Sequence, residues 1–271
     1  MFINVLKTVI LGIVEGITEW LPISSTGHLI LVNKIMNTAD SFFETDLFLY
    51  AIQLGAILAI VTLYFKKLNP FAPSKSKAER TQTIGMWLKV IAACLPAAVI
   101  GLLLNSFMEK FENPYVISAT LIIYGIAFII IENRERKATL LNINDMSFKT
   151  ALLIGLFQVL SIVPGTSRSG ATILGAVILG TSRELAAEFS FFLAIPVMVG
   201  VSFLKLITND YLMTSSEWIL LIVAMAVAYA VSMAAVKLLT GYVKKHDFKV
   251  FGYYRIILGV IILILCLVNV L

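Results

Sequence analysis

Two stretches with polar side chains interrupt an otherwise apolar chain: GIVEGITEWLPISSTGHLI at residues 12–30 and GLFQVLSIVPGTSRSGATI at residues 155–173. They contain Glu15, Glu19 and Arg168, charged groups that each cost roughly 2.5 to 3.5 kcal/mol at the centre of a bilayer even on insertion scales. Such groups normally line a cavity that the protein encloses for a function. We therefore expect both stretches to contribute to the functional site.

The remainder of the chain is composed like a membrane protein. Of its 271 residues, 59% are hydrophobic and 14% are charged, which predicts an all-α polytopic membrane protein. The six expected transmembrane helices are residues 47–65, 86–105, 115–132, 187–207, 217–238 and 251–270. The basic residues behind the net charge of +5 lie in a few connecting loops. This distribution is typical of cytoplasmic loops, so we predict contact with the bilayer and none with nucleic acid.

Both polar stretches interrupt a helix at a proline. Pro22 and Pro164 each follow an apolar segment and precede a Ser/Thr/Gly turn and a second short apolar segment. Proline lacks an amide donor and disfavours helix in the residue before it. A broken backbone at membrane depth is tolerated only where protein or a water-filled cavity covers it. We therefore predict two re-entrant helical hairpins, at residues 2–36 and 150–180.

The order of segments repeats along the chain, because each predicted hairpin is followed by three spans. Residues 1–140 would form a first repeat and residues 141–271 a second, within one integrated membrane domain. Three spans are an odd number, so the second repeat would enter the membrane from the opposite side. Basic loops at 66–80, 134–137 and 244–249 then mark the cytoplasmic face and leave both termini outside. An inverted-topology repeat brings the broken helices together near the bilayer midplane.

Two carboxylates of the first motif are candidates for a metal site. Glu15 and Glu19 are four residues apart, so both side chains lie on one helix face. Paired carboxylates suit a hard divalent cation such as Mg²⁺ or Ca²⁺, which also binds phosphate oxygens. We predict that this pair binds the cofactor and takes part in catalysis. Two alternatives stay open: proton transfer by one of the acids, or a structural pair satisfied by backbone and serine groups.

Hydroxyl side chains follow Pro22 at the start of the second short helix, where oxygens cap a helix and free amides bind anions. Ser24 and Thr26 are therefore predicted to contribute to phosphate binding. Ser25 and His28 are three residues apart and share a helix face, with Ser25 as nucleophile and His28 as base. Helix capping alone would explain a serine, and a satisfied structural histidine is the alternative for His28.

Arg168 lies at the centre of the second motif, in a turn that leads into a helix. A guanidinium group offers a planar fork of donors that matches phosphate oxygens, and a helix N-terminus adds amides and a positive dipole. We predict that Arg168 binds phosphate together with the hydroxyls of Ser167, Ser169 and Thr172. The alternatives are an ion pair with the first motif for the arginine and helix capping for the hydroxyls. Gln158 either hydrogen-bonds within the site or joins neighbouring helices.

The motifs EGITEWLPISSTGHL and PGTSRSGAT resemble the two signature stretches of the bacterial undecaprenyl-diphosphate phosphatases of the bacitracin-resistance type. Glu15 and Glu19 meet the acidic signature (E/Q)xxxE. The signature PGxSRSxxT is met by Pro164, Gly165, Ser167, Arg168, Ser169 and Thr172. The resemblance covers the whole chain in length and in the order of spans. Trp20 stands where phenylalanine is more usual in that family, which we expect to matter only for packing.

The resemblance implies hydrolysis of the C55 lipid undecaprenyl diphosphate to its monophosphate and inorganic phosphate. That reaction recycles the lipid carrier for cell-wall peptidoglycan synthesis and gives bacitracin resistance. The resemblance also implies a divalent metal and a multi-pass protein of the bacterial cytoplasmic (inner) membrane, with an active site open to the outer face. The sequence leaves a homodimer open, because apolar surfaces look alike whether they meet lipid or protein.

Hydrolysis could follow either of two schemes. In one, Ser25 attacks the terminal phosphorus with His28 as base; in the other, a phosphoenzyme forms on His28. A function of a different class also stays open: a lipid-phosphate transporter or flippase could use the same inverted-repeat site without hydrolysis. A transporter does not need a serine and a histidine beside two acids, so we expect the phosphatase.

Overall fold

The computed structural model describes residues 2–38, 41–134, 137–208 and 211–271, without the side chains of residues 105, 106, 109 and 206. This part of the chain is helical, with one isolated β-bridge and no strand. The helices are α1 (Phe2–Thr18), α2 (Ser25–Met36), α3 (Asp46–Leu63), α4 (Phe65–Leu68), α5 (Lys77–Met108), α6 (Pro114–Glu132), α7 (Phe148–Val159), α8 (Arg168–Ile178), α9 (Arg183–Ile207), α10 (Ser215–Val243) and α11 (Lys249–Leu267). Short 3₁₀ turns are η1 (Phe42–Glu44), η2 (Glu109–Phe111) and η3 (Leu160–Ile162).

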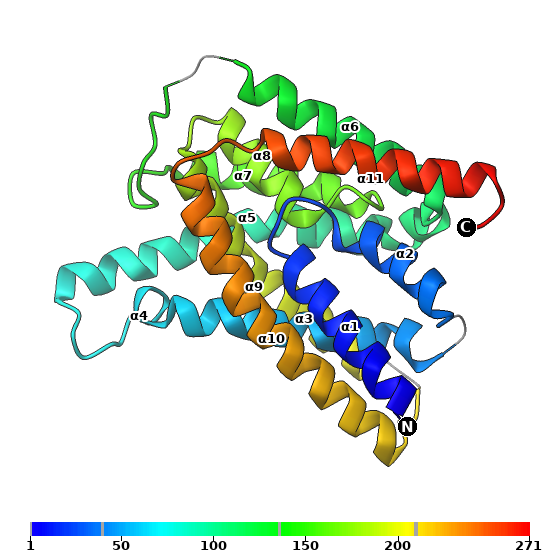
Figure 1. Cartoon of the computed structure of the whole chain (residues 1–271). Helices are drawn as coiled ribbons and strands as arrows, with labels where there is room; N and C mark the ends of the chain where they lie inside the picture. The colour runs from blue at the N-terminus through cyan, green and yellow to red at the C-terminus, as the bar shows by residue number, and fades with distance from the viewer. Residues whose placement is uncertain (1, 39–40, 135–136, 209–210) are drawn as a thin grey trace.

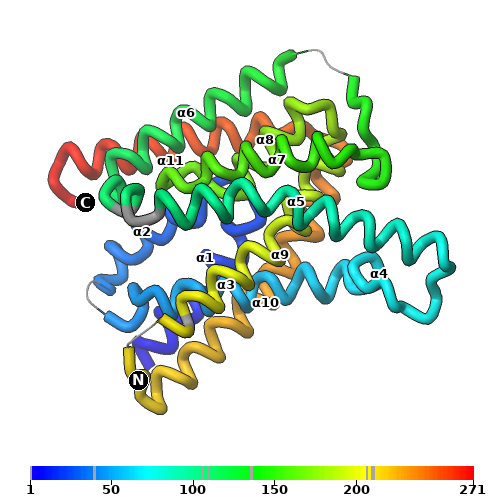
Figure 2. Tube along the Cα trace, turned by 180° about the vertical axis from the view of Figure 1, so that it is seen from behind, coloured from blue at the N-terminus to red at the C-terminus, as the bar shows by residue number. Residues whose placement is uncertain are grey.

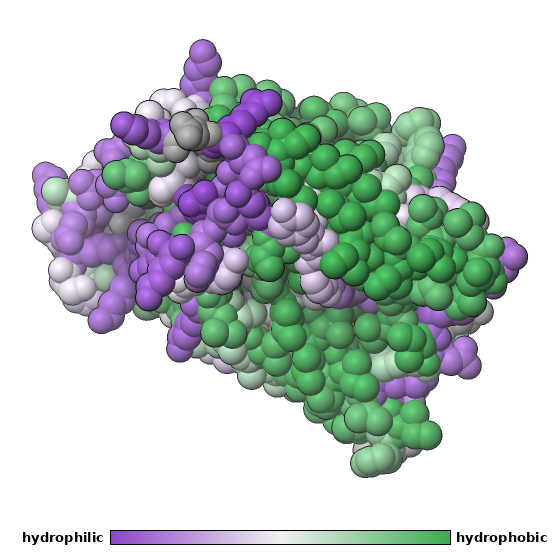
Figure 3. All heavy atoms as spheres, turned by 45° about the horizontal axis from the view of Figure 1, so that its top comes forward, coloured by the Kyte–Doolittle hydropathy of each residue, from purple (hydrophilic) through white to green (hydrophobic). Residues whose placement is uncertain are grey.

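Six of these helices, α3, α5, α6, α9, α10 and α11, are long and apolar enough to cross a membrane. The prediction of an all-α multi-pass membrane protein is therefore confirmed. Figure 3 shows a broad apolar surface between one strongly polar end and a smaller set of polar residues at the other. Helix α5 begins at Lys77 rather than at residue 86, because its first turns are polar and extend the helix beyond the apolar run. In the predicted basic loop at 134–137, residues 135 and 136 lie outside the described residues.

The helices pack in matched pairs. Helix α1 lies along α10, and α7 lies along α5, while α3 packs against α9 and α6 against α11 (Figures 1 and 2). Glycine makes the first two contacts close: a Cβ at Gly12 would lie 2.9 Å from the carbonyl oxygen of Ala224, and one at Gly155 would lie 2.1 Å from that of Ala93. Helices α1 and α7, which lead into the two prolines, are thus packed against their partners in the same way.

Gly155→Ala is expected to destabilise the protein by about 1–3 kcal/mol, because the added methyl group overlaps the α5 backbone and one of the helices must move. Gly85→Ala is the matched control, since a Cβ there meets nothing within 4 Å, and helix propensity favours alanine by about 1 kcal/mol. Thermal unfolding of the detergent-solubilised variants measures the difference. Equal midpoints for Gly155→Ala and the unchanged protein would contradict the close contact.

Each polar motif contains a non-helical break between two helices. Helix α1 ends at Thr18 and α2 begins at Ser25, while η3 ends at Ile162 and α8 begins at Arg168. The prolines at 22 and 164 lie inside these breaks, as their effect on the preceding residue predicts. The first helix of each pair is shorter than the apolar run, because the chain leaves the helix before it reaches the proline. Each break brings the start of the following helix, α2 or α8, into the interior of the fold.

Candidate active site

The two motif turns, residues 19–24 and 163–167, end on a serine of similar backbone conformation. Ser24 (φ 74°) and Ser167 (φ 71°) both adopt a positive φ, which non-glycine residues rarely do and which clusters at functional sites. Each serine caps the helix that follows: the Ser24 hydroxyl accepts from Gly27 N at 3.4 Å, and the Ser167 hydroxyl accepts from Gly170 N at 3.2 Å. The remaining first-turn amides of α2 and α8 have no intrahelical acceptor and are suited to an anion.

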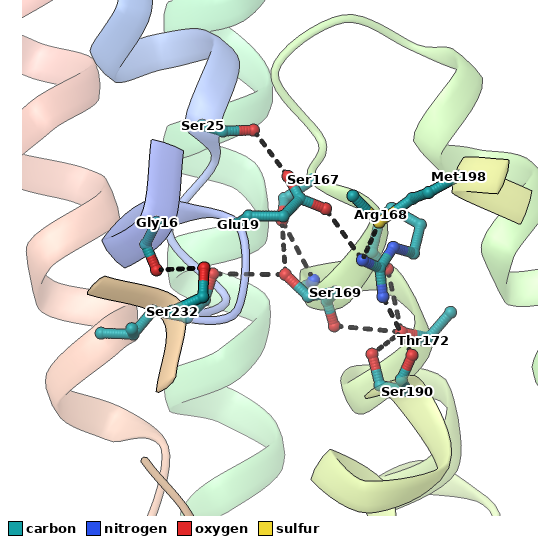
Figure 4. A network of polar contacts seen from close by, with 12 residues as sticks. Gly16, Glu19, Ser25, Ser167, Arg168, Ser169, Thr172, Ser190, Met198 and Ser232 are labelled. Carbon is teal, nitrogen blue, oxygen red and sulfur yellow. Dashed lines mark hydrogen bonds and ion pairs between the residues drawn. The ribbon is translucent and has the colours of Figure 1, made fainter. Parts of the chain in front are cut away.

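The two motifs meet at Glu19 (Figure 4). Arg168 Nη2 donates to Glu19 Oε1 at 2.8 Å, and the Ser25 hydroxyl donates to Glu19 Oε2 at 3.1 Å. A second link joins the turns directly, because the Ser169 hydroxyl donates to the carbonyl oxygen of Leu21 at 3.2 Å. Glu19 and the Ser25 hydroxyl of the first motif and the arginine of the second are therefore neighbours in space.

Arg168 is held from several sides. Its Nη1 donates to the carbonyl oxygen of Ser190 on α9 at 2.9 Å, and its guanidinium lies 5.8 Å from the ring centre of Trp20. The side chains of Arg168 and Glu19 are 12% and 10% exposed, so this ion pair is largely removed from solvent. Removing one member of such a pair leaves the other charge buried without its partner. The fixed guanidinium is thus oriented before any ligand binds.

Glu15 and Gln158 occupy corresponding positions in the two motifs, and each is only 1% exposed. Within the part of the chain that the structure describes, neither carboxylate oxygen of Glu15 and neither side-chain polar atom of Gln158 has a hydrogen-bond partner. An unpartnered buried carboxylate is costly, and a cation would satisfy it. The described residues contain no group of three His, Cys, Asp or Glu side chains that could hold a metal. Glu15 and Glu19 are the side chains here whose chemistry suits a divalent ion. The Glu15 oxygens have no partner among the described residues, whereas both Glu19 oxygens accept hydrogen bonds, from Arg168 and from Ser25.

His28 makes its hydrogen bonds with residues other than Ser25. Its Nδ1 lies 2.7 Å from the carbonyl oxygen of Ser24, and its Nε2 lies 2.7 Å from the hydroxyl of Tyr254. A carbonyl only accepts, so Nδ1 carries a proton; in the neutral ring Nε2 then accepts from Tyr254. Among the described contacts no hydrogen bond joins Ser25 to His28. The structure therefore brings Ser25 to Glu19 and His28 to Tyr254, and it does not show the serine and histidine pair expected from their spacing.

The other predicted hydroxyls differ in what they contact. Thr26 lies in the wall of a cavity beside α2, together with Ser25. Thr172 is fully buried, and its hydroxyl lies 2.7 Å from that of Ser190 and also donates to helix carbonyl oxygens. Ser24 and Ser167 cap their helices, as described above. Thr172 thus joins α8 to α9, whereas Thr26 is free to contact a ligand in the cavity.

A cavity of about 1090 Å³ lies beside α2. Ser25 and Thr26 from the first motif and Ser161 and Pro164 from the second contribute to its wall. The volume is slightly above the usual range of about 300–1,000 Å³ for small-molecule sites. Ser25 connects this wall to Glu19, its hydrogen-bond acceptor, and through Glu19 to Arg168. A phosphorylated ligand in this cavity would therefore reach groups from both motifs.

Two residues at the site were not among the predicted ones. Tyr254 contacts His28, and its neighbour Arg255 donates to the turn carbonyls of both motifs. Both belong to α11, which the hydropathy pattern identifies only as a membrane span. A charged residue four positions inside such a span is itself the signal that could have revealed the pair, because a charge at this depth is rarely without a role.

Comparison with known proteins gives consistent results over nearly the whole chain. The family model described as Bacitracin resistance protein BacA matches residues 8–261. A relative from Latilactobacillus sakei subsp. sakei, named undecaprenyl-diphosphatase, is 54% identical over 267 residues and covers 96% of this chain and 97% of the relative. Proteins of the same name from Streptococcus suis (55% identical over 271 residues; 97% of each chain) and Enterococcus faecalis (51% over 272 residues; 97% and 98%) are similar to the same extent.

Proposed function

We propose that this chain, which belongs to the bacitracin resistance protein BacA family, hydrolyses undecaprenyl diphosphate to undecaprenyl phosphate and inorganic phosphate. Its near full-length relatives are named for that reaction. The hydrogen bonds of Glu19 support this chemistry. The Glu19 carboxylate accepts from the Ser25 hydroxyl and from Arg168 at once, beside a cavity large enough for a diphosphate head group. The product is the lipid carrier in the form that cell-wall synthesis reuses.

In the proposed reaction the Ser25 oxygen attacks the terminal phosphorus. The hydroxyl proton passes to Glu19, its hydrogen-bond acceptor at 3.1 Å, rather than to His28 as the spacing had suggested. A bond forms from the serine oxygen to phosphorus, and the bond from phosphorus to the bridging oxygen breaks, so undecaprenyl phosphate leaves. Water then attacks the phosphoserine, releases inorganic phosphate and restores the hydroxyl. A phosphoenzyme on His28 is less well supported, because both ring nitrogens are engaged in hydrogen bonds.

Arg168 and the helix starts bind the transferring phosphoryl group in this scheme. Developing negative charge on the phosphate oxygens is stabilised most by donors that are already oriented. The contacts of Arg168 with Ser190 and Glu19 provide that orientation. The first-turn amides of α2 and α8 add donors and the positive ends of two helix dipoles. Thr26, which lines the cavity, and the hydroxyls of Ser167 and Ser169 extend this set.

Glu15 and Glu19 would hold a divalent cation, Mg²⁺ or Ca²⁺. The unpartnered, buried carboxylate of Glu15 supports this assignment. When bound, such an ion would supply positive charge that neutralises the phosphate oxygens. Gln158, equally buried and unpartnered, is proposed as a hydrogen-bonding residue of the same site.

The proposed architecture is an inverted-topology repeat with two re-entrant hairpins, divided near residue 140. Support comes from the matched serine caps and from the equivalent packing of α1 on α10 and α7 on α5. In Figure 1 the start of α1 and the end of α11 lie toward the same end of the molecule, opposite the loop that carries α4. With basic loops on the cytoplasmic side of the inner membrane, both termini and the cavity mouth would face outward. The homodimer stays a prediction.

Chelation is expected to abolish phosphate release from the purified protein in detergent. Excess EDTA should lower release from undecaprenyl diphosphate by at least about 10²-fold, and added Mg²⁺ or Ca²⁺ should restore it, because the diphosphate charge is then neutralised again. Phosphate is measured colorimetrically, with the Glu15→Gln variant as a second test of the ligand. Full activity in EDTA would contradict the metal assignment.

The same assay separates the phosphatase from a lipid-phosphate transporter. Detergent micelles have no second compartment, so transport cannot produce inorganic phosphate. Binding of the lipid without phosphate release, in the presence of both cations, would favour the transporter. The names of the relatives support hydrolysis and give the transporter no support.

A further inference from the structure

Arg255 connects the two motif turns. It lies on α11, its side chain is completely buried, and its guanidinium donates only to backbone carbonyl oxygens among its described hydrogen bonds. Nη1 donates to Pro22 at 3.1 Å, and Nη2 donates to Gly165 at 3.1 Å and to Thr166 at 2.9 Å. We propose that Arg255 is a positioning residue that fixes the relative position of the two turns and thereby aligns the reacting groups that follow them.

The contact depends on the shape of the guanidinium. Its planar fork presents donors in two directions at once, so one side chain reaches the first motif through Nη1 and the second motif through Nη2. A lysine ammonium is a single point and cannot occupy both places. The fork also lies against the start of α8, because a Cβ at Gly170 would be 3.0 Å from Arg255 Nη1. The glycine at this position therefore leaves room for the arginine.

A hydrogen bond from α6, the helix packed against α11, fixes the second turn in the same way. Thr120 on α6 donates to the carbonyl oxygen of Pro164 at 2.8 Å, as Arg255 on α11 does to that of Pro22. The two helices are closely packed, since a Cβ at Gly125 would lie 2.7 Å from the carbonyl oxygen of Gly252. The α6 and α11 pair thus holds the carbonyl of each motif proline.

The reacting groups follow directly in the chain. Arg168 is two residues beyond Thr166, and Ser25 is three residues beyond Pro22. Movement of either turn would change the distances from Glu19 to Arg168 and to Ser25, which are now 2.8 Å and 3.1 Å. A displacement of about 1 Å at a reacting group can reduce turnover by about 10²-fold. Arg255 would therefore act through other residues, without contact to the substrate.

The chain contains a matched control. Lys89 on α5 is also a buried cation, 9% exposed, and donates to the carbonyl oxygens of Ile143 and Asn144 at 2.9 Å each. These carbonyls belong to the loop before α7, outside the motif turns. Lys89→Met and Arg255→Met remove the same kind of contact from a loop and from the motif turns, respectively. Arg255→Lys retains the charge and is the milder variant.

The decisive measurement is amide hydrogen exchange of the detergent-solubilised proteins, read on peptides that cover the two turns and the loop at 139–147. In Arg255→Lys and Arg255→Met we expect both turns to exchange faster by about tenfold or more, because the bonds that oppose local opening are gone. The loop should be unchanged. Lys89→Met should show the opposite pattern. Unchanged exchange at both turns, or an equal rise in all three segments, would overturn the proposal.

The expected loss of turnover depends on the proposed function, whereas the exchange pattern does not. Arg255→Met should lower kcat for phosphate release by about 10²-fold, with a smaller loss in Arg255→Lys and less than about threefold in Lys89→Met. Near-normal kcat in both Arg255 variants would refute the catalytic part. If the unchanged protein releases no phosphate, the proposed function fails, and the exchange of the turns still decides whether Arg255 fixes them.

Discussion

Arg168→Lys is expected to lower phosphate release by about 10³-fold, the range found when a preoriented donor to a developing phosphoryl charge is removed. The lysine retains the positive charge but loses the planar fork. In the structure one arm of that fork binds the Ser190 carbonyl while the other binds Glu19. An ammonium group cannot maintain both contacts, so the charge would no longer be fixed in front of the phosphorus.

Arg183→Lys provides the control for this prediction. Arg183 also binds a buried carboxylate, that of Glu132, with its Nε 3.1 Å from each carboxylate oxygen, but it lies at the start of α9 next to the α10 end, away from the motif turns. We expect phosphate release by Arg183→Lys to differ from that of the unchanged protein by less than about threefold. Both variants are compared by steady-state phosphate release after size-exclusion chromatography has shown equal folded fractions. Near-normal turnover in Arg168→Lys would refute its phosphate-binding role.

The helical class and the proximity of the two motifs could be predicted because they follow from strong constraints. Apolar runs that span a bilayer have few alternatives, and buried charges must find partners. Glu19 and Arg168 have opposite charge and lie on broken helices, so their contact at 2.8 Å is the outcome that the cost of separate burial favours. The ion pair that appeared as an alternative for Arg168 is present. It does not exclude phosphate binding.

The orientation of individual side chains could not be predicted from spacing. Ser25 and His28 share a helix face, yet the histidine is drawn to Tyr254 and the serine to Glu19. Tyr254 is more than two hundred residues away in the chain, and a tyrosine at the start of an apolar span gives no sign of its partner. The partners of Arg255 could not be predicted for the same reason: its charge inside a span marks the residue, but carbonyl oxygens of distant turns leave no trace in the local sequence.

Ser25→Ala is expected to have the largest effect, a loss of phosphate release of about 10⁴-fold or more, as for other nucleophiles whose removal leaves only binding and electrostatic stabilisation. Alanine retains the helix start, because the cap is the hydroxyl of Ser24. The variant should therefore fold and bind the lipid diphosphate while it fails to transfer the phosphoryl group. Ser161→Ala is the control, since this hydroxyl lines the same cavity but donates to the Gln158 carbonyl oxygen.

The variants also distinguish the two nucleophiles. If serine attacks, acid quenching of the enzyme with substrate labelled in the terminal phosphate should trap an acid-stable phosphoserine in the peptide that contains Ser25, and none in Ser25→Ala. A phosphohistidine is acid-labile and would be found only after alkaline quenching, in the peptide with His28. Label on His28, or turnover that survives in Ser25→Ala, would refute the serine scheme. His28→Gln should then retain the phosphoserine, because the hydroxyl proton passes to Glu19, at 3.1 Å from the attacking oxygen.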